Sequence, residues 1–304
     1  MIVLAYHNVL AHSPGAFNML ARKEWLPLRA FEKQLDAIAT HYRVVPLADV
    51  ASAMREGRAL PDACALTFDD GNLGAYRYAA PLLEARGLPA TFFVVTGRLE
   101  DGESHDAFDR LEAALALTER DALDLSSIGE GVLASDCDGC KLRCYERLSK
   151  RLRDASPADR ARLFDALADA ADVPDAGLAQ YLSHEAYQSI TWDDARDLVH
   201  RGFAVGSHGR THVALSRLDG AVLSSEVQGS YRALSEAIGA DQREFAFSYP
   251  FGRAKHMSEA AIASVREAGY TCALTMEPGA NAAGGDLFVM RRMVYKGLKK
   301  LGRA

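Results

Sequence analysis

Short apolar runs alternate with stretches of helical periodicity along most of this 304-residue chain. The runs are rich in β-branched and aromatic residues, a composition typical of buried strands. They occur at MIVLAY, YRVVPL, ACALTF, PATFFVV, FAVGS, EFAFSY, YTCALT and LFVMRRMV. Strands that alternate with helices predict parallel pairing, because each crossover helix returns the chain to the same edge of the sheet. The series therefore predicts an α/β fold, a distorted (β/α) barrel of about seven to eight parallel strands.

The middle of the chain carries a different pattern. From about residue 99 to 189 the strand signal disappears, and helical patterns such as FDRLEAALAL and ADRARLFDALADAA replace it. We therefore expect a single domain over residues 1–304 that is interrupted by a helical insertion at about 99–189. The strand series resumes after a further helix, for which Thr191 and Asp194 form a capping-box-like start and Gly202 an end.

Composition places the chain among ordinary globular proteins, because 49% of its residues are apolar and 25% are charged. The formal net charge of −6 provides no basic field, so we expect no nucleic-acid partner. The first residues, MIVLAYHNVL, are too short to span a bilayer and lack a basic leader region. They favour a first strand, no transmembrane segment and a cytoplasmic location, with peripheral membrane association as an alternative. The oligomeric state stays open.

Two adjacent carboxylates, Asp69 and Asp70, end the apolar run ALTF and precede Gly71. Neighbouring carboxylates repel each other unless a cation lies between them, and a divalent metal meets that need. Successive side chains of a strand point to opposite faces, so both reach one pocket only where the strand breaks into a turn. One carboxylate could then bind the metal while the other takes a proton from the attacking water. A plain turn is the alternative.

Two further segments carry candidate chemistry. His208 and His212 lie four residues apart in SHGRTH, and with one aspartate they would leave a metal coordination position open for water. Solvated or capping histidines are the alternative. The segment FSYPFG places Tyr249, Pro250 and Phe251 after another strand, where they could contact substrate and the N–H of Phe251 could line an oxyanion hole. An aromatic-flanked turn is the alternative there.

Together these segments resemble the polysaccharide deacetylases of carbohydrate esterase family 4, also called the NodB-homology family. In that family TFDDG supplies a catalytic-base Asp and then a metal-ligand Asp, H-[ST]-x-x-H supplies two metal ligands, and R-x-P-[FY]-G lines the substrate groove. By resemblance, Asp69 is the base, and the metal ligands are Asp70, His208 and His212. The N–H of Phe251 is then an oxyanion donor.

The chain departs from the family motifs at several positions. Gly209 stands where the family has Ser or Thr, and Ser248 stands where it has the Arg that orients the base. Arg292, in the last apolar run, could fill that role from a neighbouring strand; a salt bridge or a solvated edge charge is the alternative. The family's late L-x-H general acid is missing. His7 in AYHNV resembles the general-acid histidine of a circularly permuted branch of the family, typified by biofilm poly-N-acetylglucosamine deacetylases. The alternative is a histidine at the end of a strand whose ring nitrogens are simply hydrogen-bonded.

The resemblance implies a metal-dependent hydrolase that removes N-acetyl groups from an amino-sugar-containing glycan or from its carrier-linked precursor in surface polysaccharide biosynthesis. Metal-activated water, deprotonated by Asp69, would attack the amide carbonyl, and His7 would protonate the leaving amine. Two His and one carboxylate suit Zn²⁺, with Ni²⁺ or Co²⁺ as alternatives. Two other functions stay open: an allantoinase-like amide hydrolase without metal, and a catalytically silent glycan-binding protein.

Three of the five cysteines, Cys137, Cys140 and Cys144, lie close together within the expected insertion. Their C-x2-C-x3-C spacing suits thiolate ligation, so a second metal site is one interpretation, although a structural zinc site takes four ligands. A reduced, partly exposed cluster is the interpretation that the sequence favours. A disulfide scaffold is not expected, because five cysteines do not form an even secretory framework.

Overall fold

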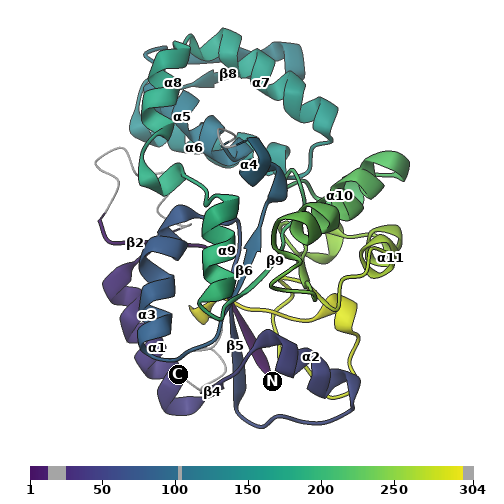
Figure 1. The fold of residues 1–304 in the computed structure, drawn as a ribbon. Helices are drawn as coiled ribbons and strands as arrows, with labels where there is room; N and C mark the ends of the chain where they lie inside the picture. Colours follow the sequence, from purple (N-terminus) through teal and green to yellow (C-terminus); the bar gives the residue numbers. More distant parts are fainter. Residues whose placement is uncertain (13–24, 102–104, 297–304) are drawn as a thin grey trace. The chain divides into compact units, whose positions relative to one another are not determined.

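Parallel strands from both ends of the chain share one sheet in the computed structural model, which describes residues 1–12, 25–101 and 105–296 (Figure 1). Within these residues, the strands in spatial order are β1 (Ile2–Tyr6), β5 (Ala63–Phe68), β6 (Thr91–Val94), β9 (Ala204–Ser207), β10 (Phe247–Ser248) and β11 (Ala273–Leu274), with β4 (Arg43–Val44) also paired to β5. Isolated parallel bridges from Leu274 to Met290 and from Met293 to Leu4 join the two edges. The sheet is therefore a distorted (β/α) barrel, which confirms the predicted fold class.

The chain divides into two units, each with its own internal contacts. The first, which we call the barrel unit, consists of the described residues of Met1–Ala11, Leu26–Ser104 and Ser189–Ala304. The second, which we call the helical unit, consists of those of His12–Trp25 and His105–Gln188.

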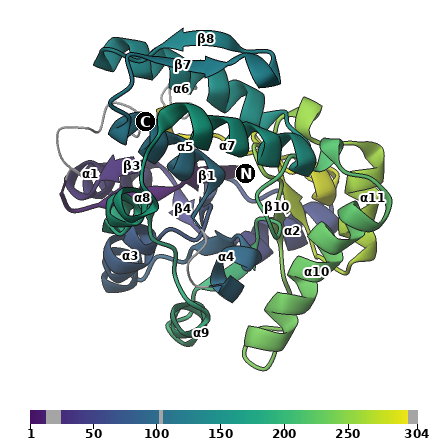
Figure 2. The same cartoon turned by 90° about the horizontal axis from the view of Figure 1, so that it is seen from above.

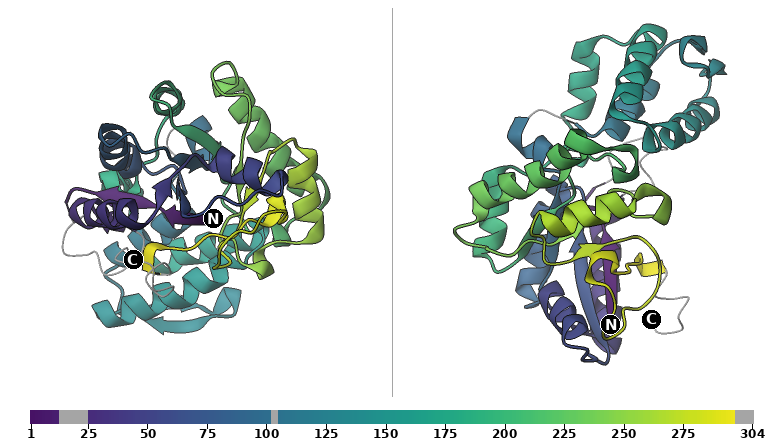
Figure 3. Two further views of the ribbon diagram at one scale, coloured as in Figure 1. Left: turned by 90° about the horizontal axis from the view of Figure 1, so that it is seen from below. Right: turned by 90° about the vertical axis from the view of Figure 1, so that its right-hand side faces the viewer.

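Helices of the barrel unit surround its strands (Figure 3, left). They are α1 (Leu28–His41), α2 (Leu47–Arg55), α3 (Ala80–Ala85), α4 (Thr96–Asp101), α9 (Trp192–His200), α10 (Gly220–Ile238) and α11 (Glu259–Glu267), and the short strands β2 (Asn8–Leu10) and β3 (Trp25–Pro27) complete the described elements near the amino terminus. Helix α9 begins at the predicted capping box: Thr191 Oγ1 accepts the N–H of Asp194 at 3.2 Å, and the Asp194 carboxylate accepts the N–H of Thr191 at 2.8 Å. Among the described helices, none is both long and apolar enough to cross a membrane.

The side chains of β5 alternate between two apolar clusters. Leu66 and Phe68 pack in the large cluster that includes buried residues of α1 and α9. Ala65 belongs to a second cluster on the other side of the strand. Thr67 and then Asp69 continue the series of Ala65 at two-residue spacing. Strand periodicity thus directs Asp69 away from the cluster that contains α1 and α9, and toward the inside of the barrel end.

The helical unit combines four helices with an antiparallel hairpin (Figure 2). The elements are α5 (Ala107–Leu117), β7 (Ala122–Leu125), β8 (Gly131–Ala134), α6 (Asp138–Arg153), α7 (Pro157–Ala171) and α8 (Asp175–Leu182). In its interior, the buried carboxylate of Glu112 accepts hydrogen bonds from the hydroxyls of Tyr181, at 3.2 Å, and Tyr187, at 2.8 Å. The expectation of helices alone was wrong for the hairpin, because its strands are only four residues long and half-exposed.

Candidate active site

The predicted site residues of the barrel unit converge at the carboxyl ends of its strands. His7 follows β1, Asp69 and Asp70 follow β5, and His208 follows β9. The parallel register aligns Tyr6 with Phe68, so that the residues after these strands emerge at one level. Segments that are far apart in the sequence therefore meet at the end of a parallel barrel where active sites are found.

Three side chains form a compact donor set. The Oδ1 atom of Asp70 lies 3.5 Å from Nε2 of His208 and 3.6 Å from Nε2 of His212. Asp70 has a left-handed backbone, with φ of 74°, and this breaks the strand alternation so that its side chain joins the site. Its buried Oδ1 has no hydrogen-bond partner within the described part of the chain. A buried carboxylate oxygen facing two imidazoles fits a divalent cation.

The orientation of His208 suits a metal ligand. Its Nδ1 lies 2.8 Å from the backbone oxygen of Ser248, and because a carbonyl only accepts, Nδ1 carries the proton. Nε2 is then left with its lone pair toward Asp70. Burial lowers the pKa of His208, which favours the neutral ring that a metal requires.

Asp69 and Arg292 form a buried bidentate salt bridge. Two guanidinium nitrogens of Arg292 donate to the two carboxylate oxygens of Asp69, each at 2.8 Å. The exposed fractions are 0% for Arg292 and 2% for Asp69, so the pair is removed from solvent. Burial by itself raises the pKa of Asp69, but the guanidinium of Arg292, with His208 and His7, outweighs it and holds the pKa far below the usual range. Asp69 is therefore ionised at every physiological pH.

Ser248 connects the two halves of the site. Its hydroxyl accepts from Nη2 of Arg292 at 2.7 Å and donates to Oδ2 of Asp69 at 3.3 Å, while its backbone oxygen binds His208. The small Ser side chain stands where the resembled motif has an arginine. Here the guanidinium beside Asp69 comes instead from the segment that closes the barrel, which also places Arg292 Nη1 3.1 Å from Thr67 Oγ1.

His7 is half-buried and lies beside the same carboxylate. The N–H of Asp69 donates to the backbone oxygen of Tyr6 at 2.9 Å, which places the residue after β1 next to the end of β5. The charge of His7 contributes to lowering the pKa of Asp69. The structure thus brings His7 to the site that the sequence assigned to it.

The three residues of the YPF turn have different surroundings. Tyr249 is fully buried, and its hydroxyl donates to the backbone oxygen of Phe288 at 3.0 Å, so the prediction that its side chain contacts substrate is wrong. Pro250 is buried as well. Phe251 is half-buried, adopts a left-handed backbone with φ of 61°, and places its ring centroid 4.8 Å from that of His212. Phe251 is therefore the member of the turn that borders the donor set.

With this geometry in place, the comparison with known proteins identifies the chain. It matches the polysaccharide deacetylase family over residues 57–119 and 164–273, more than half of its length. The chain belongs to the polysaccharide deacetylase family. The deacetylase is therefore a hydrolase of the class that removes acetyl groups from glycans.

Several solved structures share the fold of this deacetylase. The deacetylase PplD of Streptococcus pyogenes, in complex with acetate, has 16% sequence identity and a TM-score of 0.62, covering 99% of this chain and 96% of that chain. IcaB from Ammonifex degensii has 19% identity and a TM-score of 0.60, covering 100% and 97%. The BpsB deacetylase domain from Bordetella bronchiseptica has 17% identity and a TM-score of 0.55, covering 96% and 94%. No curated protein matches the sequence.

A residue that sequence reasoning missed holds the histidine loop of the deacetylase. The buried carboxylate of Glu226, on α10, accepts the N–H groups of Arg210 and Thr211, each at 2.7 Å, and the Thr211 hydroxyl at 2.8 Å. Gly209 has a φ of 80°, and a Cβ there would lie 2.7 Å from Oε1 of Glu226. The positive φ favours glycine here, and a larger residue would also have to displace the Glu226 carboxylate. The sequence offered no signal for Glu226, which lies in an ordinary helical pattern.

The cysteine cluster differs from both interpretations of the sequence. Cys137 and Cys140 form a disulfide in the helical unit, and bonded sulfurs do not act as thiolate ligands. Cys144 is a free thiol whose Sγ donates to the backbone oxygen of Ala134 at 3.1 Å. The expected reduced cluster and the joint three-thiolate site are therefore not the arrangement in the structure.

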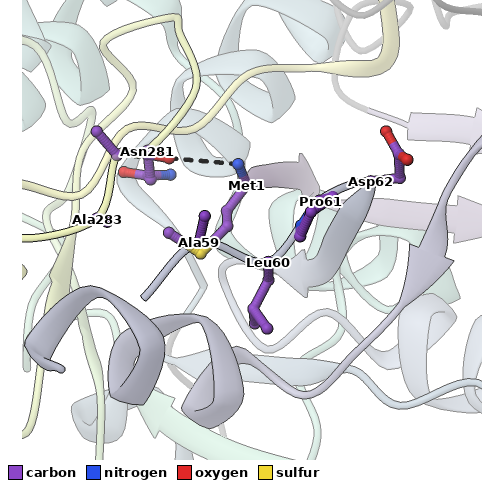
Figure 4. Close-up of a pocket in the computed structure, with 8 residues that line it drawn as sticks. Met1, Ala59, Leu60, Pro61, Asp62, Asn281 and Ala283 are labelled. Atoms are coloured by element: carbon purple, nitrogen blue, oxygen red, sulfur yellow. Dashed lines mark hydrogen bonds between the residues drawn. The ribbon is translucent and has the colours of Figure 1, made fainter. Parts of the chain in front are cut away.

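A pocket of about 360 Å³ is lined by Met1, Leu60, Asp62 and Asn281, among other residues (Figure 4). Met1 and Asp62, which line it, precede β1 and β5, whereas the site residues follow these strands. The amino group of Met1 donates to the backbone oxygen of Asn281 at 3.3 Å. This pocket is thus separate from the candidate active site of the deacetylase.

Proposed function

We propose that this deacetylase removes N-acetyl groups from an amino-sugar-containing glycan or its carrier-linked precursor, with Asp70, His208 and His212 holding one divalent metal. The observation that carries the proposal is the convergence of two imidazole nitrogens on the unpartnered Oδ1 of Asp70. This donor set suits Zn²⁺, with Ni²⁺ or Co²⁺ as alternatives. When bound, the metal would polarise the acetyl carbonyl and lower the pKa of a water molecule.

Asp69 would take the proton of the attacking water. Because Arg292 lowers the pKa of Asp69, this carboxylate is always ready to accept a proton but is a weak base. It can therefore deprotonate only a water that has been made acidic, which ties its role to the neighbouring donor set. Arg292 and Ser248 would fix the orientation of the carboxylate through their hydrogen bonds.

His7 and Phe251 would act on the amide itself. His7, beside Asp69, would carry the proton that the leaving amine needs, since an amine leaves readily only when it is protonated. The left-handed backbone of Phe251, next to His212, supports a backbone N–H directed to the developing oxyanion. Pro250, which is buried behind it, would fix this turn.

The intact donor set also bears on the alternative functions. An allantoinase-like hydrolase without metal does not need two imidazoles around an unpartnered carboxylate oxygen, and a silent glycan-binding protein does not need a buried Asp69–Arg292 pair. Both features support the metal-dependent deacetylase. A cytoplasmic encounter with the substrate remains a prediction from the sequence.

We further propose that the segment at about 99–189 is an insertion in one deacetylase domain. The family match omits the residues between 119 and 164, and these residues lie within the His105–Gln188 segment of the helical unit. The segment would then determine substrate range without contributing to the metal site, whose donors all belong to the barrel unit.

The decisive experiment measures metal content and acetate release on the same preparation. The purified chain should hold one divalent metal, release acetate from chitooligosaccharides, lose that activity on chelation and regain it with Zn²⁺. The His212→Ala variant should neither hold metal nor respond to Zn²⁺. Undiminished acetate release by the metal-free protein would contradict the proposal, and bound metal without acetate release would move the substrate to another amide.

A further inference from the structure

The bonded cysteine pair of the helical unit occupies a position that the deacetylase chemistry does not use. Cys137 is the N-cap of the 16-residue helix α6, and Cys140 lies in its first turn, with their Cα atoms 5.0 Å apart and their sulfurs joined. The N–H of Cys140 also donates to Sγ of Cys137 at 3.1 Å. The pair lies between residues 119 and 164, which the family match omits. It is therefore a feature of this chain that the family assignment does not explain.

The two sulfurs have different surroundings. Cys137 is exposed, whereas Cys140 is 7% exposed and its Sγ accepts a hydrogen bond from Nη2 of Arg143 at 3.1 Å. A helix N-terminus and a guanidinium both stabilise a thiolate, while the exposed carboxylates of Asp136 and Asp138 oppose this at the outer sulfur. The outer sulfur is accessible to a small reagent, and the inner sulfur has a cation beside it.

We propose that Cys137 and Cys140 form a thiol–disulfide exchange site whose co-substrates are a low-molecular-weight thiol and its disulfide. The thiolate of the small thiol attacks Sγ of Cys137, the bond between the two protein sulfurs breaks, and Cys140 leaves as a thiolate beside Arg143. A second small thiolate attacks the sulfur of the small molecule in the mixed disulfide, so that the small disulfide forms and Cys137 leaves as a thiolate. The protein disulfide gains two electrons and two protons, and two small thiols become one small disulfide. The reverse sequence oxidises the pair.

Cys144 limits the site to two cysteines. Its Sγ donates to the backbone oxygen of Ala134, and burial raises the pKa of this thiol, so it remains protonated. In the reduced protein the Asp136 carboxylate and the two cysteine thiolates could bind a metal together. They provide three donors, whereas a structural zinc site takes four. The guanidinium of Arg143 also occupies one side of the Cys140 sulfur. The contacts therefore favour exchange over metal binding.

The Cys140→Ser variant of the full chain tests the proposal, because it keeps the exposed sulfur and removes the one that resolves a mixed disulfide. With glutathione disulfide it should gain one glutathione per chain at Cys137, whereas the wild type should not accumulate this adduct. Cys144→Ser, one helical turn further on, is the matched control and should behave as the wild type. Alkylation of the reduced wild type should be about tenfold or more faster at Cys137 than at Cys144.

Peptide mass spectrometry after an alkylating quench measures both the glutathione adducts and the alkylation of each cysteine. Circular dichroism checks that each variant is folded. A folded Cys140→Ser variant that stays unmodified at Cys137, or that carries glutathione equally on Cys144, would overturn the proposal. So would stoichiometric Zn²⁺ on the reduced pair in a His208→Ala background, if it blocked glutathione addition; the cysteines would then be a metal site. None of these outcomes depends on acetate release, so the deacetylase proposal is tested separately.

Discussion

The largest charge that lowers the pKa of Asp69 belongs to Arg292, which lies 223 residues away in the sequence. Arg292 reaches the barrel end from the closing segment and binds both carboxylate oxygens, with Thr67 and Ser248 bound to the same guanidinium. A planar guanidinium matches a carboxylate in this bidentate way, and a lysine does not. At this site, therefore, orientation and ionisation of the carboxylate come from the same contact.

The Asp69→Asn variant should lose activity but keep its metal. An amide cannot accept the proton of the attacking water, so kcat/KM should fall by about 10²- to 10⁴-fold, the usual contribution of a general base. Metal content, measured on the same preparation, should match the wild type because Asp70, His208 and His212 are unchanged. His208→Ala is the contrasting variant and should lose both. An Asp69→Asn protein with full activity would show that Asp69 is not the base.

Replacing Arg292 should create a new pH dependence. In Arg292→Met the largest charge that opposes burial is gone, and His208 and His7 counter burial less, so the pKa of Asp69 should rise and activity should be lost as pH falls through it. The wild type should show no such loss of activity at low pH from this group, because its Asp69 remains ionised. The unfolding free energy should also fall by about 3–5 kcal/mol, since a buried charge loses its partner.

The measurements are a pH profile of kcat/KM and urea unfolding at neutral pH. The double variant Asp69→Asn/Arg292→Met, which removes both charges, should recover part of the lost stability but none of the activity. An unchanged pH profile in Arg292→Met would argue against Arg292 as the group that sets the ionisation of Asp69.

Among the elements, α10 has a role at the site that its sequence pattern does not reveal. Its Glu226 accepts three hydrogen bonds from the loop that carries His208 and His212, and a side chain at Gly209 would have to displace this carboxylate. The loop is also bound from the other side, since the N–H of Thr96 at the start of α4 donates to the backbone oxygen of Gly209 at 3.0 Å. Two helices thus fix the distance between the two imidazoles.

Glu226→Ala should therefore weaken metal binding without touching a ligand. Loss of such outer contacts typically costs about 10- to 100-fold in metal affinity. Zn²⁺ affinity, measured by chelator competition, should show a drop of this size, and Glu226→Asp should recover little because its carboxylate is one methylene shorter. Glu236→Gln, an exposed position on the same helix, is the control and should leave affinity unchanged. Wild-type affinity in Glu226→Ala would mean that the loop holds its shape unaided.

The sequence predicted elements and motif positions better than it predicted contacts between them. Strand alternation and the Thr191 capping box are local, and both were confirmed. Arg292 was identified only as a candidate, because its contact with Asp69 depends on barrel closure. The error at Tyr249 has a similar cause: Tyr249 follows β10, and its side chain packs in the large apolar cluster whereas that of Ser248 binds Asp69, a difference that depends on how distant segments pack. Glu226 could not have been found, because one carboxylate in a helix resembles any other.

For the molecule as a whole, the two candidate chemistries belong to different units. The donor set and Asp69–Arg292 belong to the barrel unit, and the cysteine pair belongs to the helical unit. The chain leaves and rejoins the barrel unit close to the loops that carry the site residues. The N–H of Gly97, in α4, donates to the backbone oxygen of Arg210, in the histidine loop, at 3.0 Å. The N–H of Ile190 donates to the backbone oxygen of Gly71, next to Asp70, at 2.9 Å. The insertion proposed above would therefore interrupt neither motif.

Metal binding should therefore protect only one of the two units against opening. A ligand stabilises a protein by RT ln(1 + [L]/Kd), about 2.7 kcal/mol at a free concentration of 100 Kd, but only for openings that destroy its site. Hydrogen exchange read by mass spectrometry should show that Zn²⁺ slows exchange in β5, β9 and the His208–His212 loop, and leaves α6 and α7 unchanged. The His212→Ala variant should show no slowing anywhere. Equal protection of the helical unit by Zn²⁺ would mean that the two units open together, and that the helical unit is part of the cooperative structure that holds the metal.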